Sequence, residues 1–146
     1  MVCINNVRQK MTKAEIENIA RVRFKRSTVP DPRFSDSDVS SIEQRFECQL
    51  PEGFAAMREL IGTYCISGDH LPAKEVLLNY DWELKNNPNW TEDFIPFYAV
   101  GNGDYLCFRR SECPQSGVYY VAHDDPQVQR LHASFDDYLC DADWFS

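Results

Sequence analysis

The spacing of apolar residues changes once along the chain, and this change limits its possible folds more than any other feature. In residues 12–62 apolar side chains recur every three to four positions, which is the period of an amphipathic helix. After Gly68 they stand in short runs separated by turn residues, which is typical of hairpin-linked strands. Helices followed by such strands indicate an α+β fold. We expect a mainly antiparallel sheet flanked by N-terminal helices and one C-terminal helix.

Three helices are predicted in the first half. Residues 12–24 open on Thr12 and Glu15, the two side chains of a capping box. A second helix ends near Cys48, and a third starts at Pro51, because proline suits the first helical turn. The apolar residues that define the second and third helices are Val39, Ile42, Phe46, Phe54, Met57, Leu60 and Ile61.

The second half is predicted to contain strands and a closing helix. Residues 75–80 are expected to form a strand and residues 82–89 a polar loop. Residues 94–100 form the next expected strand, in which Pro96 favours an edge position or a bulge. A tight turn at 101–104 leads to strands at 105–108 and 118–121. The last helix is expected to be capped by Ser134, to carry Phe135, Tyr138 and Leu139, and to have Trp144 and Phe145 at its end.

Charge is distributed unevenly along the chain. The net charge is −8, which divides into +5 for residues 1–33 (eight bases, three acids) and −13 for residues 34–146 (seven bases, twenty acids). We expect one globular unit, with residues 1–33 as a basic helical arm packed on a domain of residues 34–146. An acidic body repels nucleic acid and attracts basic proteins. One alternative for the acidic residues remains open, namely that they only keep the chain in solution. For the basic face of the first helix, two alternatives remain: it is merely solvated, or it contacts nucleic acid.

The chain shows no sign of membrane insertion or export. No apolar run approaches the roughly 18 residues of a membrane helix, and the first residues lack a secretion signal. We therefore expect a cytoplasmic protein, either a monomer or a weak homodimer. The cysteines are irregularly spaced and form no Cys-x-x-Cys pair, which favours reduced thiols over disulfides or zinc. They are Cys3, Cys48, Cys65, Cys107, Cys113 and Cys140.

Four short motifs, in order over about residues 36–145, resemble the SUKH superfamily of immunity proteins (the Smi/Knr-like family), which also includes eukaryotic cell-wall-synthesis regulators. The first is a helix that leads into Leu50-Pro51-Glu52-Gly53-Phe54, and the second is Phe94-Ile95-Pro96-Phe97 followed by Gly103-Asp104. The third is Gly117-Val118-Tyr119-Tyr120-Val121 with a trailing His123-Asp124, and the fourth is Ser134-Phe135-Asp136-Asp137. One departure is Ile66-Ser67-Gly68-Asp69, where the family usually has Asn-Gly-Gly. The motif residues interpreted as structural are Leu50, Pro51, Gly103, Asp104, Val118, Tyr119, Ser134 and Phe135.

The resemblance implies that the protein neutralises a bacterial toxin by binding it. A nuclease toxin has a basic cleft, which carboxylates can occupy in place of nucleic acid. Trp82 and Trp90 would anchor such a contact if they are exposed. The acidic candidates for the contact are Asp81, Glu83, Glu92, Asp93, Asp124, Asp125, Asp136 and Asp137.

Two alternatives remain open. One is a regulatory adaptor of the same family that binds a cellular protein. The other is a metal-dependent hydrolase using His123 and Asp124 with His70 or His132. Adjacent strand residues point to opposite faces, which argues against convergence of His123 and Asp124. Cys107 has no neighbouring base or helix N-terminus to activate it as a nucleophile. We therefore expect no catalysis and no cofactor.

Overall fold

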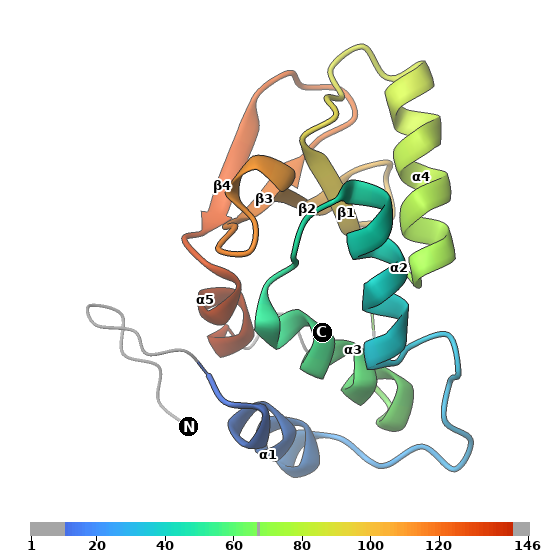
Figure 1. The fold of residues 1–146 in the computed structure, drawn as a ribbon, viewed down its shortest axis with the longest axis vertical. Helices are drawn as coiled ribbons and strands as arrows, with labels where there is room; N and C mark the ends of the chain where they lie inside the picture. The colour runs from blue at the N-terminus through green and yellow to red at the C-terminus, as the bar shows by residue number, and fades with distance from the viewer. Residues whose placement is uncertain (1–10, 67, 142–146) are drawn as a thin grey trace.

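The computed structural model describes residues 11–66 and 68–141 (Figure 1). Four helices come first: α1 (Lys13–Arg23), α2 (Asp36–Phe46), α3 (Glu52–Thr63) and α4 (Ala73–Asn86). Four strands follow: β1 (Phe94–Ala99), β2 (Tyr105–Arg109), β3 (Val118–Val121) and β4 (Val128–His132), with a 3-10 turn, η1 (Arg110–Glu112), between β2 and β3. Helix α5 (Phe135–Cys140) closes the described chain. The sheet is antiparallel in the order β1-β2-β3-β4, which confirms the α+β prediction.

Local sequence signals set several helix ends. At the start of α1 the Thr12 hydroxyl accepts a hydrogen bond from the Glu15 N–H, and the Glu15 carboxylate accepts one from the Thr12 N–H, both at 3.2 Å. This is the predicted capping box. The Ser134 hydroxyl accepts a hydrogen bond from the Asp137 N–H at 3.1 Å and so caps α5. Gly103 adopts a φ of +95° in the turn between β1 and β2, a conformation that favours glycine.

The prediction for residues 75–89 is wrong. Instead of a strand and a loop, α4 spans Ala73–Asn86 and starts directly after Pro72. Val76, Tyr80 and Glu83 lie on its buried face at spacings of four and three residues. The apolar run at 76–78 is short, and a run of that length does not distinguish a strand from a helix.

Strand β4 was not predicted. Its residues are exposed or half-buried, so the apolar alternation that marks a strand is weak. It forms because residues 128–132 pair with β3, and the register shifts between Val118 and Tyr119. Helix α5 ends at Cys140, and the predicted end at Trp144 and Phe145 lies outside the described residues.

The first aromatic cluster lies between one face of the sheet and helices α3 and α5. A register shift between Pro96 and Tyr98 confirms the predicted bulge. The ring of Phe97, at this bulge, stacks on Phe108 with centroids 4.5 Å apart. Phe54 of α3 and Phe135 of α5 meet the Phe108 ring edge-on, at 5.1 and 5.4 Å. These side chains fix both helices against the sheet.

A second aromatic cluster covers the other face. Phe94 and Tyr105 lie on this face, and Trp90 packs edge-on against both, at 5.6 and 5.4 Å. Tyr80 of α4 contacts Trp90, and Phe46 of α2 contacts Tyr80. Helix α4 is therefore held by its inner face, and its outer face is left to solvent.

A buried cation lies between α2 and α3. The side chain of Arg58 is fully buried and donates a hydrogen bond to Asp38 at 2.8 Å. Its guanidinium lies 4.9 Å from the Phe34 ring centroid and 5.0 Å from that of Phe54. Its Nε and Nη1 atoms make no hydrogen bond within the described chain. The guanidinium of Arg58 therefore has one ion-pair partner, Asp38, and otherwise lies between aromatic rings.

The outer edge of β1 is covered by residues 69–71. The Leu71 N–H donates to the Phe97 carbonyl and the Ala99 N–H donates to the Asp69 carbonyl, both at 2.9 Å. Between them His70 and Tyr98 form an antiparallel bridge. This edge of the sheet therefore has partners from within the chain.

Among the described cysteines, Cys48, Cys65, Cys107 and Cys113 are free thiols. Cys140 is in a disulfide, so the prediction of reduced thiols is wrong for this residue. Burial raises the pKa of the Cys107 thiol well above its ordinary value, which disfavours the reactive thiolate. In the described part of the chain no helix has the length and apolar character needed to span a membrane.

Candidate protein-binding surface

Two large apolar side chains stand exposed on the outer face of α4. Leu78 and Trp82 are 58% and 60% exposed, and they are four residues apart, so they are neighbours along one side of the helix. Exposed tryptophans are typical anchors of protein interfaces. Trp82 was predicted as a contact residue and Leu78 was not, because residues 75–80 were expected to form a strand and residues 82–89 a loop.

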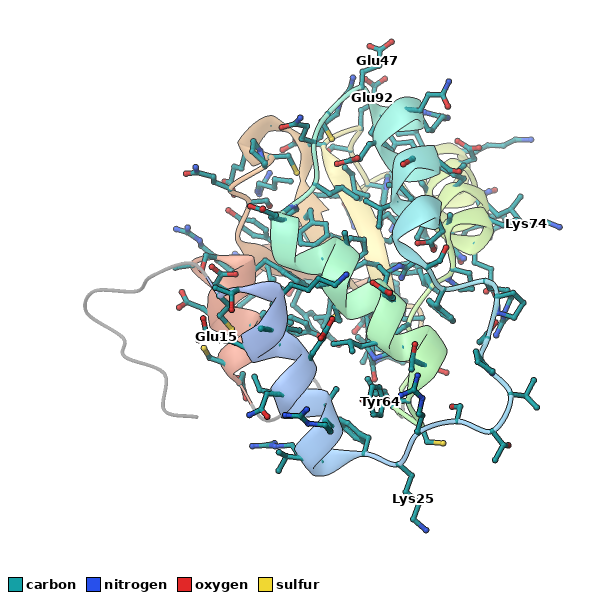
Figure 2. All side chains as sticks on the ribbon, turned by 60° about the horizontal axis from the view of Figure 1, so that its bottom comes forward. Glu15, Lys25, Glu47, Tyr64, Lys74 and Glu92 are labelled. Carbon is teal, nitrogen blue, oxygen red and sulfur yellow. The ribbon has the colours of Figure 1, made fainter. Side chains whose placement is uncertain are left out.

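The surface beside Leu78 is hollowed. Its lining comes from Arg33, from Pro72 and from the first turns of α4, including Ala73, Lys74 and Glu75. Figure 2 shows Lys74 projecting away from the helix. The hollow and the Leu78–Trp82 ridge form one continuous stretch along α4, because both contain Leu78.

Acidic side chains lie near the C-terminal part of α4. Asp81 is exposed and accepts a hydrogen bond from Arg45 of α2 at 2.8 Å. Glu92 is exposed, and its backbone carbonyl accepts the Tyr80 hydroxyl at 2.9 Å. Glu47, at the end of α2, is 83% exposed and lies 3.7 Å from Arg110. Figure 2 shows Glu47 and Glu92 at the same end of the molecule.

We use the name α4 surface for Leu78, Asp81 and Trp82 with Glu47 and Glu92 at the rim. Burial and the neighbouring Glu92 raise the pKa of the Tyr80 hydroxyl, and Arg45 and Asp81 act on the same hydroxyl. Asp81 and Glu92 therefore both lie near the Tyr80 hydroxyl. An apolar ridge with charged side chains around it has the composition of a protein interface.

Two of the predicted contact residues are buried and must be corrected. Trp90 is 6% exposed and packs in the second aromatic cluster, so its ring is not on the surface. Glu83 is also 6% exposed. Its carboxylate accepts hydrogen bonds from the Tyr105 hydroxyl and the Asn87 amide, both at 3.1 Å. Both side chains support the fold beneath α4.

Asp93 is held by internal hydrogen bonds. Its carboxylate accepts the Ser111 N–H at 2.7 Å, the Ser111 hydroxyl at 2.9 Å and the Arg109 guanidinium at 3.2 Å. Burial opposes its ionisation, but these bonds outweigh burial and lower the pKa of Asp93. These hydrogen bonds attach η1 to the start of β1. They account for the position of the Asp93 carboxylate without a contact to another protein.

Asp136 and Asp137 lie apart from the α4 surface. Both are half-buried in the first turn of α5, and Figure 1 shows α5 and α4 on opposite sides of the molecule. The Asp136 carboxylate accepts a hydrogen bond from the Met11 N–H at 3.2 Å. The ten predicted contact residues therefore do not form one continuous patch.

Asp124 and Asp125 are exposed in the turn after β3, together with His123. His123 and Asp124 do not follow the alternation of a strand, because β3 ends at Val121. Ligand-type atoms of Asp104, His123 and Asp124 lie within 4.8 Å of one another.

Asp104, which directly precedes β2, is already occupied by hydrogen bonds from β3 and from this turn. Its Oδ1 accepts the His123 N–H at 2.9 Å and lies 2.7 Å from the His123 Nδ1, and its Oδ2 accepts the Tyr120 hydroxyl. A metal ion would have to replace these bonds. His132 pairs instead with Asp141, and His70 packs on Tyr98. The described residues therefore bring neither His70 nor His132 to His123, as the hydrolase alternative required.

The Asp104–His123 contact predicts a defined pH response. The hydrogen bond to Asp104 raises the pKa of His123, so its contribution to stability is complete below about pH 6.5 and is lost as the pH rises through the raised value. Burial opposes ionisation of Asp104, but bonds from Tyr120 and His123 lower its pKa from 3.8 to about 2. The contribution of Asp104 is therefore lost as the pH falls from about 4 towards about 2.

NMR titration of the His123 ring is the measurement. We expect Asp104→Asn to bring the pKa of His123 down towards that of an ordinary histidine. Asp125→Asn is the matched control, because this exposed neighbour does not contribute to the shift. An unchanged His123 titration in Asp104→Asn would show that the contact does not set the pKa.

Comparison with known proteins gives one match. Residues 33–141 match the model of the SMI1 / KNR4 family (SUKH-1), which is more than half of the 146 residues. No curated protein and no solved structure matches the chain. The family match begins after α1, at the segment that leads into α2.

Proposed function

Because the chain belongs to the SMI1/KNR4 (SUKH-1) family, we propose that it is an immunity protein that binds and neutralises a cognate bacterial toxin. SUKH-1 proteins are known as immunity proteins of polymorphic toxin systems. The protein acts through contact alone, without bond chemistry and without a cofactor. The observation that carries the proposal for this chain is the exposed pair Leu78 and Trp82 on α4.

The α4 surface suits a basic partner. Desolvation of the Trp82 ring and the Leu78 side chain supplies affinity, because burying apolar area contributes about 25 cal/mol per Å². Glu92 favours approach of a positively charged cleft, such as that of a nuclease. Asp81 and Glu47 add to this attraction, although each is already paired with an arginine of this chain. The apolar centre sets how long the complex lasts, and the acidic rim sets how fast it forms.

The surface is also arranged in advance of binding. Asp81 is held by Arg45, whose guanidinium lies 5.5 Å from the ring centroids of both Phe46 and Tyr80. Those two rings belong to the core that fixes α2 against α4. Side chains on rigid helices lose little conformational freedom on binding, which favours affinity.

The direct test is co-expression with the product of the neighbouring gene, followed by titration of the purified pair. Trp82→Ala is expected to weaken the complex by about 2–4 kcal/mol, or roughly 30- to 700-fold, mainly through faster dissociation. Its free energy of unfolding should change by less than about 0.5 kcal/mol, because the ring is mostly exposed. Leu131→Ala, an exposed apolar residue on β4, is the matched control.

Two results would contradict the proposal. One is the absence of a complex with the neighbouring toxin at micromolar concentration. The other is equal affinity of Trp82→Ala and wild type, which would place the contact elsewhere. The regulatory-adaptor alternative predicts a cellular protein as the partner and no toxin gene beside this one, so the gene neighbourhood separates the two.

A further inference from the structure

Most arginines of the described chain are neutralised by a nearby carboxylate. Within residues 33–141 five arginines have an acidic partner within 4 Å: Arg33 with Asp31, Arg45 with Asp81, Arg58 with Asp38, Arg109 with Asp93 and Arg110 with Glu47. Arg130 donates instead to the Ala133 carbonyl. Arginines in this part of the molecule are therefore used to build the fold.

The end of α1 and the segment after it differ. Residues 18–30 contain four bases, Arg21, Arg23, Lys25 and Arg26, and no acid. All four are exposed. Arg21 donates to the Asn18 side-chain oxygen at 2.7 Å, and Lys25 and Arg26 make no ion pair within the described chain. Positive charge is thus left available to an outside partner.

This segment is fixed in place along the C-terminal end of α3. The Ser27 N–H donates to the Thr63 carbonyl and the Asp31 N–H to the Gly62 carbonyl, both at 2.8 Å. Lys25 accepts the Cys65 N–H at 2.9 Å through its carbonyl. A Cβ atom at position 62 would lie 2.3 Å from the Phe34 carbonyl oxygen, so only glycine permits this approach. The cations are therefore presented on a rigid backbone.

The fixed segment has apolar as well as charged features. Val22, within the run of bases, is 75% exposed, and Val29, three residues after Arg26, is 82% exposed. A cleft of about 380 Å³ between α1 and α3 is lined by Arg21, Arg26 and Tyr64. Glu17 and Glu59 line the same cleft. Figure 2 shows Tyr64 and Lys25 at the end of the molecule opposite Glu47 and Glu92.

We propose that residues 21–29 and the adjoining cleft bind an acidic segment of a partner protein. Carboxylates of such a segment would pair with Arg21, Lys25 and Arg26, and its apolar side chains would cover the two valines. Arginines and apolar side chains together are typical of protein interfaces. We use the name basic surface for residues 21–29 with this cleft.

Two other anionic partners fit the geometry less well. A nucleic-acid backbone offers continuous negative charge but no apolar group for Val22 and Val29, and it extends beyond the patch towards a body of net charge −13. An anionic bilayer is a broad surface that would also meet Glu17 and Glu59. A protein segment is short and can place its charges to avoid these acids.

The test uses a fluorescein-labelled peptide of about twelve residues, in which glutamate alternates with valine, and fluorescence anisotropy on the full chain. We expect the wild type to bind it and the double variant Lys25→Glu/Arg26→Glu to lose on the order of tenfold or more in affinity, since two attractions become repulsions. The control Lys74→Glu/Lys85→Glu carries the same change of net charge on α4 and should keep the affinity. Circular dichroism and Tm establish that both variants are folded.

Three results would overturn the proposal: no binding of the peptide to the wild type, equal loss in the α4 control, or tighter binding of single-stranded RNA or phosphatidylserine vesicles than of the peptide at the same salt concentration. The basic surface is independent of the α4 surface. Toxin binding that survives Lys25→Glu/Arg26→Glu, and peptide binding that survives Trp82→Ala, would keep the two proposals distinct.

Discussion

Replacement of Arg58 by alanine is expected to lower the free energy of unfolding by about 3–5 kcal/mol, because it leaves the Asp38 carboxylate without its buried partner. The substitution also removes the guanidinium from between the rings of Phe34 and Phe54 and leaves a cavity there. Chemical denaturation, followed by tryptophan fluorescence, measures the loss.

A second substitution separates charge from packing. Arg58→Met fills much of the same space but leaves Asp38 unpaired, so it should also destabilise the fold. The double variant Arg58→Met/Asp38→Asn removes both charges, and we expect it to recover most of that loss. Two guanidinium nitrogens have no partner in the described chain, so the ion pair costs more desolvation than a fully bonded one. A double variant as unstable as Arg58→Met would show that packing, not charge, dominates at this position.

Replacement of Phe108 by alanine is expected to cost about 3–5 kcal/mol. Phe108 is fully buried, stacks on Phe97 and meets Phe54 and Phe135 edge-on, so its removal opens a cavity where β1, α3 and α5 converge. Phe108→Leu retains most of the volume and should cost less than half as much. Denaturant titration of both variants provides the comparison, and a loss below about 1 kcal/mol for Phe108→Ala would mean that the cluster repacks around the gap.

The fold class followed from the sequence because its signals are local. The capping box at Thr12, the turn around Gly103 and the cap at Ser134 depend on residues a few positions apart. Helix α4 did not follow from the sequence, because its buried face includes Glu83, and this charged residue hides the helical period of the apolar residues. Burial of that carboxylate depends on a hydrogen bond from Tyr105, which is far along the chain.

The candidate surface was predictable only in part, for the same reason. Trp82 and Trp90 are eight positions apart and equally apolar, yet one is 60% exposed and the other 6%. The difference comes from Phe94 and Tyr105, which surround Trp90 in the folded chain. The surplus of cations at residues 21–26 also needed the structure, because pairs such as Arg45 and Asp81 are 36 residues apart.

Residues 69–71, which lie along β1, help to protect this protein from aggregation. Strand β1, with the sequence FIPFYA, is the most apolar of the four, and an open apolar strand is a template for fibrils. Residues 69–71 close that side from within. The other terminal strand, β4, carries the polar and exposed Gln129 and Arg130 and a register shift. Pairing with a strand of another molecule is therefore disfavoured at both edges of the sheet. Residues 69–71 cover the edge at β1, and a charged residue and a register shift protect the edge at β4.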